Sequence, residues 1–563
     1  MTAIDFEVDG AARTAVLDQA HTGDIRGALG TISLDDHAPR TTPSAKLKTL
    51  LAVVGPGLIV MVGDNDAGAF STYGQAGQVY GTRLLWTLLL LIPVLYVNQE
   101  MVLRLGAVTG VGHARLILSR FGKFWGTFEV IDLFLLNGLT IVTEFIGITL
   151  AAGYLGVPKV LAVAFAAGVI IATAFTGSFR AFERIAMFFC AGTLLLVPLY
   201  LMAHPAPSSM LRGFSSVGLP GGPVSGAGGG GAIPGGTAAV MLLIIGIVGT
   251  TVAPWQLFFQ QSYVIDKRIT PRFIRYEKAD LWIGIGIVVV GAAALMGTTA
   301  AAFAHSGAAF TDSAGLAHGI AGYAGHVAGA LFAVALLDAS VIGAFAVSLS
   351  SAYAIGDVLG LKHSLHRGVG QAKGFYALYA ALIGAAAVIV LLPGSPLGLI
   401  TEGVQVLAGV LLPAATVFLL MLCNDKAVLG PWVNSPRTNA FTGAVITALI
   451  ALSVVLTASV MFPHISASAI FAIMAACAAA AAVAGGGALV AGRRRAARGR
   501  AVVAATTAVA PVDKLSWRMP PLSELPAPVI KGARRLGLLG LRGYLAIAMI
   551  MVVVKIVQTA LGH

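Results

Sequence analysis

Charged residues are scarce in this chain. Asp, Glu, Lys and Arg form 11% of its 563 residues, whereas a soluble domain contains about 25%. Hydrophobic residues form 57% of the sequence, and the mean hydropathy is +0.89. This composition excludes an ordinary soluble protein and indicates a polytopic protein embedded in the lipid bilayer. The net charge of +12 does not indicate a nucleic-acid partner, because the basic residues lie between apolar stretches, where membrane orientation explains them.

Cysteines and clustered histidines are also few. Cys190, Cys423 and Cys477 are the three cysteines; all lie in apolar stretches, and no CxxC, HxxxH or HExxH pattern occurs. These absences argue against a disulfide framework and against a zinc enzyme. The sequence contains no nucleophile–base constellation either, so we expect neither an enzyme nor a bound cofactor.

Long apolar stretches dominate the sequence. A helix needs roughly 20 apolar residues to cross a bilayer. The sequence predicts twelve such spans and a thirteenth candidate, at about 49–76, 84–103, 124–155, 160–179, 185–202, 237–264, 281–304, 327–355, 374–392, 397–422, 441–462, 465–491 and 543–561.

The loops between these spans differ in charge. With the N-terminus inside, the inner loops contain sixteen Lys and Arg residues, and the outer loops up to the twelfth span contain three. Basic residues are enriched in cytoplasmic loops. The asymmetry predicts a multi-pass protein of the plasma (inner) membrane with a cytoplasmic N-terminus.

Polar segments mark the domain boundaries. Residues 1–45 carry both charge signs and predict a flexible cytosolic arm, and 46–491 form the membrane domain. Residues 492–540 predict a cytosolic linker. Residues 541–563 contain Lys555 and either cross the membrane or lie on it.

Two apolar spans are interrupted in the middle. The first, GPGLIVMVGDNDAGAFSTYGQAG over residues 55–77, has Asp64, Asn65 and Asp66 at its centre. The other, IIGIVGTTVAPWQLFFQQS, has Pro254 at its centre. A helix broken at bilayer depth frees carbonyls and amides that can bind an ion, and intramembrane charge usually serves transport. The two breaks therefore indicate a transporter.

The interrupted spans are the first and the sixth, which correspond if spans 1–5 and 6–10 form an inverted repeat. Their sequences resemble helices of the Nramp divalent-metal transporters. GPGLIVMVGDNDAG…GQAG, with GTRLLW and LRLGAVTG, resembles helices 1 and 2; VAPWQLFFQQS resembles helix 6; VQVLAGVLLPA, with NDKAVLG, resembles helix 10 and its exit. The resemblance covers about residues 48–490. It implies an all-α polytopic membrane protein of the leucine-transporter type, a 5+5 inverted repeat with additional C-terminal helices.

The resemblance also implies a metal site between the unwound parts of helices 1 and 6. The family's Asp-Pro-Gly-Asn motif aligns with residues 66–69, so the metal-binding aspartate is kept as Asp66 and the asparagine is replaced by Ala69. The family's Met-Pro-His motif aligns with Ala253, Pro254 and Trp255. The thioether ligand and the histidine are therefore both missing.

Three further positions follow from the resemblance. Gln405 aligns with a helix 10 glutamine that joins the metal coordination in closed states. Of two acidic residues on the family's proton route in helix 3, the second matches Glu144 and the first aligns with Ile141. Backbone carbonyls near Thr250 complete the expected metal site, and Gln256 is expected to line it.

The departures from the family pattern share one chemical consequence. Methionine sulfur favours transition metals over Mg²⁺ and Ca²⁺, so its replacement by Ala253 removes that preference. Loss of the amide at Ala69 opens more space. Mg²⁺ dehydrates reluctantly and is usually held through waters and one or two carboxylates. A wide site with Asp66, Asn65 and Gln405 suits a partly hydrated hard cation, and the pattern resembles the Nramp-related magnesium transporters.

Several of these residues also have structural interpretations. Asp66 is either a ligand or only the cap of the second half-helix, and Asn65 either a ligand or a group that holds the break. Gln405 is either a ligand or an interhelical hydrogen-bond partner. Four acidic residues, Asp64, Glu144, Asp338 and Glu402, either line the ion path or carry protons, or they have only a structural role.

The predicted function is alternating-access transport of a divalent cation, Mg²⁺ with Mn²⁺ also accepted, without tight proton coupling. The alternative is a proton-coupled Mn²⁺/Fe²⁺ symporter of the Nramp type. An alternative from another class is a cation channel or membrane sensor, which flux measurements distinguish because a continuous pore conducts far faster. The oligomeric state is left open by the sequence.

Overall fold

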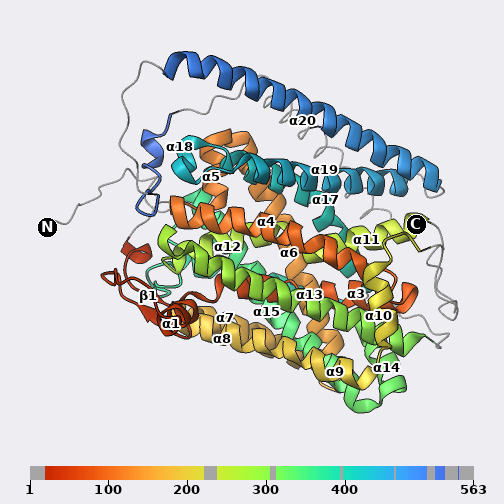
Figure 1. The fold of residues 1–563 in the computed structure, drawn as a ribbon. Helices are drawn as coiled ribbons and strands as arrows, with labels where there is room; N and C mark the ends of the chain where they lie inside the picture. Colours follow the sequence, from red (N-terminus) through yellow and green to blue (C-terminus); the bar gives the residue numbers. More distant parts are fainter. Residues whose placement is uncertain are drawn as a thin grey trace.

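Long helices lie side by side and form a bundle (Figure 1). The computed structural model describes residues 19–220, 237–304, 312–393, 397–461, 465–503, 514–526 and 543. Within these residues ten helices are long and apolar enough to cross a membrane, or eleven if the bent pair α1 and α2 is one span. A shorter apolar helix, α7, lies where the fourth span is expected. The all-helical fold class is therefore confirmed.

The helices have the following bounds: α1 Pro43–Val53, α2 Pro56–Val62, α3 Ala67–Tyr80, α4 Trp86–Thr109, α5 His113–Phe121, α6 Lys123–Tyr154, α7 Lys159–Phe175, α8 Phe179–Gly192, α9 Leu196–Ala203, α10 Pro207–Ser215, α11 Thr237–Thr251, α12 Pro254–Asp266, α13 Ile274–Phe303, α14 Ser313–Ala324, α15 His326–Leu359, α16 Lys373–Leu391, α17 Leu397–Cys423, α18 Lys426–Leu429, α19 Pro436–Met461 and α20 Ala467–Val503. Short 3₁₀ turns connect some of them. The thirteenth candidate span, 543–561, lies outside the described residues except for position 543.

The first span is broken, as the sequence predicts. It consists of α1, α2 and α3, with a bend of 54° between α1 and α2. Helix α2 ends at Gly63, and α3 begins only after Asp66, whose backbone is extended. The backbone between the two half-helices is therefore irregular at residues 64–66: the N–H groups of Asp64 and Asn65 donate to the carbonyls of Met61 and Val62 at 3.2 and 3.0 Å, and Asp66 is extended.

The sixth span breaks between α11 and α12. Ala253 has an extended backbone, and Pro254 begins α12 at its first position, where a missing N–H costs nothing. An N–H at position 254 would have bonded the carbonyl of Thr250 in a continuous helix. The proline therefore leaves the Thr250 carbonyl without that helical donor.

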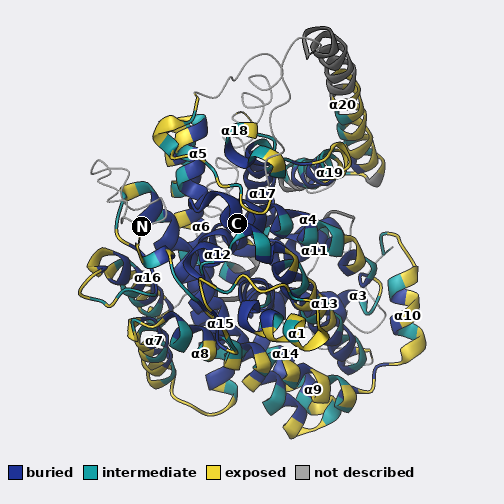
Figure 2. Ribbon diagram, turned by 60° about the vertical axis from the view of Figure 1, so that its left-hand side comes forward, coloured by how far each residue is buried: buried dark blue, intermediate teal, exposed yellow. Residues whose placement is uncertain are grey.

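Small residues allow the helices around both breaks to approach closely. A Cβ at Gly284 of α13 would lie 2.8 Å from the Gly57 carbonyl oxygen of α2. At Gly249 of α11 it would lie 3.0 Å from the Cα of Gly409 of α17. Glycine is enriched at such membrane interfaces because it brings backbones together. Figure 2 shows the resulting buried centre of the bundle.

Part of the N-terminal arm is folded onto the bundle. Strands β1 (Ile25–Arg26) and β2 (Thr31–Ile32) pair antiparallel, with Ile25 opposite Ile32 and both side chains buried. The Ala28 N–H donates to Glu183 Oε2 at 2.6 Å. The polarity of the arm predicts flexibility, but residues 19–42 are folded because their few apolar side chains pack and their backbone groups bond to the membrane domain. Residues 1–18 lie outside the described part.

The C-terminal region contributes one helix and one short segment. Helix α20 lies along one edge of the bundle (Figure 1) and continues beyond residue 491 to Val503. The segment 514–526 packs at the same end of the bundle as the arm. Trp432 donates its indole N–H to the Lys514 carbonyl at 2.7 Å, and Met519 N donates to the Val108 carbonyl at 3.4 Å.

Candidate functional site

Asp66 lies at the centre of the first break. Its side chain is almost completely buried, and Oδ1 accepts a hydrogen bond from the Ala69 N–H at 2.9 Å. Asp66 is thus the N-cap of α3, as one interpretation of the sequence expects. A carboxylate has two oxygens and about four acceptor positions, so this cap leaves capacity to bind a cation.

Gln405 of α17 reaches the same place. A Cβ at Gly68 would collide with Gln405 Nε2 and would lie 3.1 Å from Asp66 Oδ1. The Gln405 side chain is buried, and its Nε2 has no hydrogen-bond partner among the described residues. An amide that turns by 180° would present its oxygen instead. Asp66 and Gln405 therefore converge beside a glycine that leaves them room.

The end of α11 adjoins this pair. A Cβ at Gly249 would collide with the backbone oxygen of Gln405, and Thr250 follows directly. The hydroxyl of Thr250 is buried and has no hydrogen-bond partner in the described part of the chain. Nearby, Tyr73 of α3 and Thr251 of α11 share a hydroxyl hydrogen bond of 2.6 Å. The two broken spans thus meet through α3 and α11, and α17 packs against both of them, with the Gln405 amide beside the Asp66 carboxylate.

The two residues before Asp66 have different partners. Asp64 is fully buried, and its Oδ1 accepts a hydrogen bond from the Gln256 amide, which in turn accepts from Gln99 of α4 at 2.9 Å. Asp64 Oδ2 has no partner among the described residues. Asn65 instead points to α13, where its Nδ2 donates to the Val288 carbonyl at 3.4 Å.

Glu144 of α6 lies beside the site. Its Oε2 accepts from the Ala67 N–H at 3.2 Å, next to the Asp66 carboxyl. A Cβ at Gly343 of α15 would be 2.7 Å from the Glu144 carboxyl carbon, so this glycine provides the space for the side chain. Ile141, about one turn earlier on α6, is buried and apolar.

The remaining predicted residues fill the surroundings of the breaks. The Trp255 indole is buried, and its ring edge lies 3.5 Å from the Cβ position of Gly63, where α2 ends. Ser350 donates to the Trp255 carbonyl at 2.8 Å and so holds the start of α12 against α15. Ala69 and Ala253 are buried methyl groups that present no ligand atom in their side chains.

Of the two remaining predicted path residues, Asp338 and Glu402, the structure describes the side chain of Asp338. Asp338 of α15 is half-buried and lies against Gly192 of α8, where a Cβ would collide with its carboxyl group. The side chain of Glu402 lies outside the described residues. Among the residues that the structure describes, no group of three or more His, Cys, Asp or Glu side chains is placed to hold a metal together.

One histidine lies just outside the membrane spans, next to α12. The ring Nδ1 of His113 is 2.9 Å from Gln261 Oε1, and burial lowers the pKa of His113 to about 4. The imidazole is therefore neutral at physiological pH, and it adds no charge near the second break.

A buried charge network that the sequence analysis missed holds the first half of span 1. Lys267 is fully buried and donates to Glu183 Oε1 at 2.6 Å and to the Val54 carbonyl at 2.8 Å. Asp280 of α13 accepts from the N–H groups of Gly55 at 3.1 Å and Gly57 at 2.6 Å. The network thus caps the start of α2. The sequence shows only that Glu183, Lys267 and Asp280 lie at the ends of apolar spans. Which of them pair depends on tertiary structure.

Replacing Lys267 by methionine is expected to destabilise the protein by about 3 kcal/mol, because it leaves the Glu183 carboxylate buried without its cation. Thermal unfolding in detergent measures this loss. The matched double variant Lys267→Met with Glu183→Gln removes both charges and should recover most of it. Equal melting temperatures for wild type and Lys267→Met would contradict the proposed strength of the pair.

Comparisons with known proteins agree with this architecture. Residues 57–459 match the family described as natural resistance-associated macrophage protein-like, Nramp. The chain is 29% identical to a "Divalent metal cation transporter MntH" from Ralstonia nicotianae, over 70% of this chain and 87% of that protein. A protein of the same name from Chromohalobacter salexigens is 25% identical over 79% of this chain and its own full length.

Solved structures show the same fold. A crystal structure of a variant of the Eremococcus coleocola manganese transporter superposes with a TM-score of 0.62 and 22% identity, covering 83% of this chain and 97% of that one. The fold agrees with the leucine-transporter type that the resemblance implies. The family match spans well over half of the sequence, so this chain belongs to the Nramp family.

Proposed function

We propose that this chain transports a divalent metal cation by alternating access, with Mg²⁺ preferred and Mn²⁺ also accepted. The observation that carries the proposal is the meeting of Asp66, Gln405 and the proline-interrupted end of α11. This arrangement supplies one negative charge and several neutral oxygen donors. Such donors suit a hard cation that keeps part of its water shell.

The absence of a sulfur ligand at the second break supports the preference for Mg²⁺. The resemblance aligns Ala253 with the family's methionine ligand, and Ala253 precedes α12 with a buried methyl group that makes no hydrogen bond. Without a thioether, nothing in this position favours a soft transition metal over Mg²⁺. For alternating access, the irregular residues 64–66 between α2 and α3 provide the place at which the two half-helices would reorient.

The experiment is uptake into proteoliposomes that contain the purified full-length protein. We expect Mg²⁺ to accumulate, and Mn²⁺ to compete with it. Uptake of Mn²⁺ without any Mg²⁺ uptake or competition would overturn the proposed preference.

A second candidate function is proton-coupled symport of Mn²⁺ or Fe²⁺. The relatives named above support the metal of this candidate, though not its coupling, since they carry the names of a divalent metal cation transporter and a manganese transporter. The position of Glu144 beside Asp66 also favours it, because Glu144 Oε1 has no hydrogen-bond partner among the described residues and a carboxyl there can accept a proton.

We expect transport without tight proton coupling, because the rest of a proton route is missing. Trp255 replaces the family's histidine and Ile141 the first acidic residue, and neither side chain titrates. The measurement is intravesicular pH during metal uptake, which should change no more than in empty liposomes. Metal-driven acidification that disappears in Glu144→Gln would establish the symport mechanism instead.

A further inference from the structure

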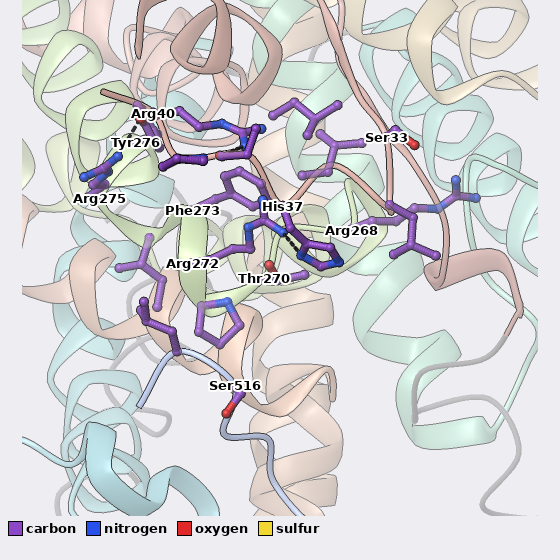
Figure 3. A pocket seen from close by; sticks show the side chains of 18 of the residues that line it. Ser33, His37, Arg40, Arg268, Thr270, Arg272, Phe273, Arg275, Tyr276 and Ser516 are labelled. Carbon is purple, nitrogen blue, oxygen red and sulfur yellow. Dashed lines mark hydrogen bonds between the residues drawn. The ribbon is translucent and has the colours of Figure 1, made fainter. Parts of the chain in front are cut away.

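A basic cavity lies at the arm end of the bundle, and none of the residues of the candidate metal site lines it. It has a volume of about 840 Å³ and lies between the N-terminal arm, the start of α13 and the segment 515–518. Figure 3 shows Arg40, Arg272 and His37 gathered around Phe273, with Arg275 on one side and Arg268 on the other. Three segments distant in sequence from one another thus contribute to one cavity, in which basic groups lie among apolar side chains.

Most of the cations in this cavity lack an acidic partner. Within the described residues, carboxylates pair with Arg40, through Asp36 at 2.7 Å, and with Lys278, through Glu100 at 2.9 Å. No ion pair forms among those residues at the other lining cations, Arg268, Arg272, Arg275 and Arg518. The cavity therefore carries an uncompensated positive charge.

These guanidinium groups are held in place by neutral acceptors. Arg268 donates to the Ala20 carbonyl at 2.8 Å and to the Asp24 carbonyl at 3.1 Å. Arg272 Nη1 contacts His37 Nδ1 at 3.0 Å, and Arg275 donates to the Tyr276 hydroxyl at 2.8 Å. Each contact uses one or two of the five N–H donors of an arginine. The guanidinium groups are therefore held in fixed orientations, and some of their N–H donors remain available to a ligand.

Two further observations indicate an anion. The Thr270 hydroxyl oxygen, on a residue that lines the cavity, is buried and has no hydrogen-bond partner among the described residues. Burial lowers the pKa of Arg518, and it lowers the pKa of Arg268 despite the nearby carboxylates of Asp266 and Asp24, which favour the charged form. A bound anion would supply both the missing charge and the missing acceptors.

We propose that this cavity binds a phosphate-bearing anion, held by Arg268, Arg272 and Arg275. The arginine fork matches the geometry of phosphate oxygens and binds them by paired, charge-assisted hydrogen bonds. The volume lies within the range of small-molecule sites. The ligand is either a soluble phosphate compound or the headgroup of an anionic phospholipid, since basic pockets at the cytoplasmic ends of membrane helices bind such headgroups.

The site would join the arm to the membrane domain. Arg268 and Arg272 adjoin the sixth and seventh spans, whereas their present partners, Ala20, Asp24 and His37, belong to the arm. An occupied cavity would therefore hold the arm against α13, which packs on both α2 and α3. This inference does not depend on which metal is transported.

The test uses purified full-length protein in detergent with EDTA, so that no transported cation contributes. Inorganic diphosphate is added at constant ionic strength, and its binding is followed by calorimetry and by melting temperature. We expect saturable binding and an upward shift of about 2–4 °C. The double variant Arg268→Gln with Arg272→Gln should weaken binding about tenfold or more.

Controls separate the site from general charge effects and from misfolding. Arg275→Gln changes an exposed residue of the cavity and should weaken binding without lowering the basal melting temperature. Arg212→Gln removes the same charge from α10, outside the cavity, and should bind diphosphate like wild type. A diphosphate effect of equal size in the wild type, Arg275→Gln and the double variant would overturn the proposal.

A second arm identifies the source of the phosphate. Melting temperatures are compared in nanodiscs of phosphatidylcholine alone and with cardiolipin added. Stabilisation by cardiolipin that is lost in Arg275→Gln assigns the cavity to a lipid headgroup, and stabilisation by diphosphate alone assigns it to a soluble compound. If neither probe stabilises the wild type more than Arg275→Gln, the cavity is not a phosphate site.

Discussion

Uptake of Mg²⁺ by proteoliposomes is expected to fall to the level of empty vesicles when Asp66 is replaced by alanine. Asp66 supplies the charge at the point where α3 begins, and Gln405 approaches the same point. Neutral carbonyl and amide oxygens alone do not compensate the loss of water by a divalent cation. Removal of the carboxylate should therefore abolish binding, while the helices that pack around it remain.

The variant Asp66→Asn separates the role of Asp66 as a metal ligand from its role as the cap of α3. Loss of a helix cap costs about 1 kcal/mol, and asparagine caps a helix as well as aspartate does. Asp66→Asn should therefore keep the melting temperature of wild type and still lose uptake. Asp66→Ala should lose both uptake and a small part of its stability.

A cap elsewhere in the chain provides the control for the alanine variant. Asp312 caps α14 by accepting from the Gly315 N–H at 2.8 Å, outside the site. Asp312→Ala should lower stability by a similar amount and leave uptake intact. Normal Mg²⁺ uptake by Asp66→Asn would mean that Asp66 serves only as a cap and that the proposed metal site is wrong.

The two breaks were predictable because their causes are local. Pro254 lacks the N–H that a continuous helix needs, and the polar residues 64–66 interrupt an apolar run. Both features act through the residues next to them in sequence. The places of the ten long apolar helices in the described part of the chain were predictable for the same reason, since each depends on its own apolar length.

The directions of side chains at the breaks were not predictable. Asp64, Asn65 and Asp66 are neighbours in sequence, yet they face α12, α13 and the start of α3 respectively. The irregular backbone has no period from which such directions follow. The folded arm and the Lys267 network were missed because their partners lie far away in the sequence, and composition alone describes these residues as polar or as loop charges.

Selectivity is expected to reverse when the two lost side chains of the family pattern are restored. The double variant Ala69→Asn with Ala253→Met should raise the ratio of Mn²⁺ to Mg²⁺ transport about tenfold or more. The thioether adds a soft ligand, which favours Mn²⁺ or Cd²⁺ over Mg²⁺. Both alanines are buried beside the breaks, so the new side chains also occupy space that a partly hydrated Mg²⁺ needs. Initial rates for the two ions, measured in competition, give the ratio.

The variant Ala69→Asn with Ala253→Leu distinguishes the two causes. Leucine has nearly the volume of methionine but no sulfur. If the sulfur ligand sets the preference, the leucine variant should not gain transport of Mn²⁺ or Cd²⁺. Its added bulk should still lower Mg²⁺ transport. If space alone sets it, the methionine and leucine variants should behave alike, and the argument from ligand softness fails. If the missing thioether is the reason for the Mg²⁺ preference, only the variant that contains methionine should become selective for Mn²⁺ or Cd²⁺.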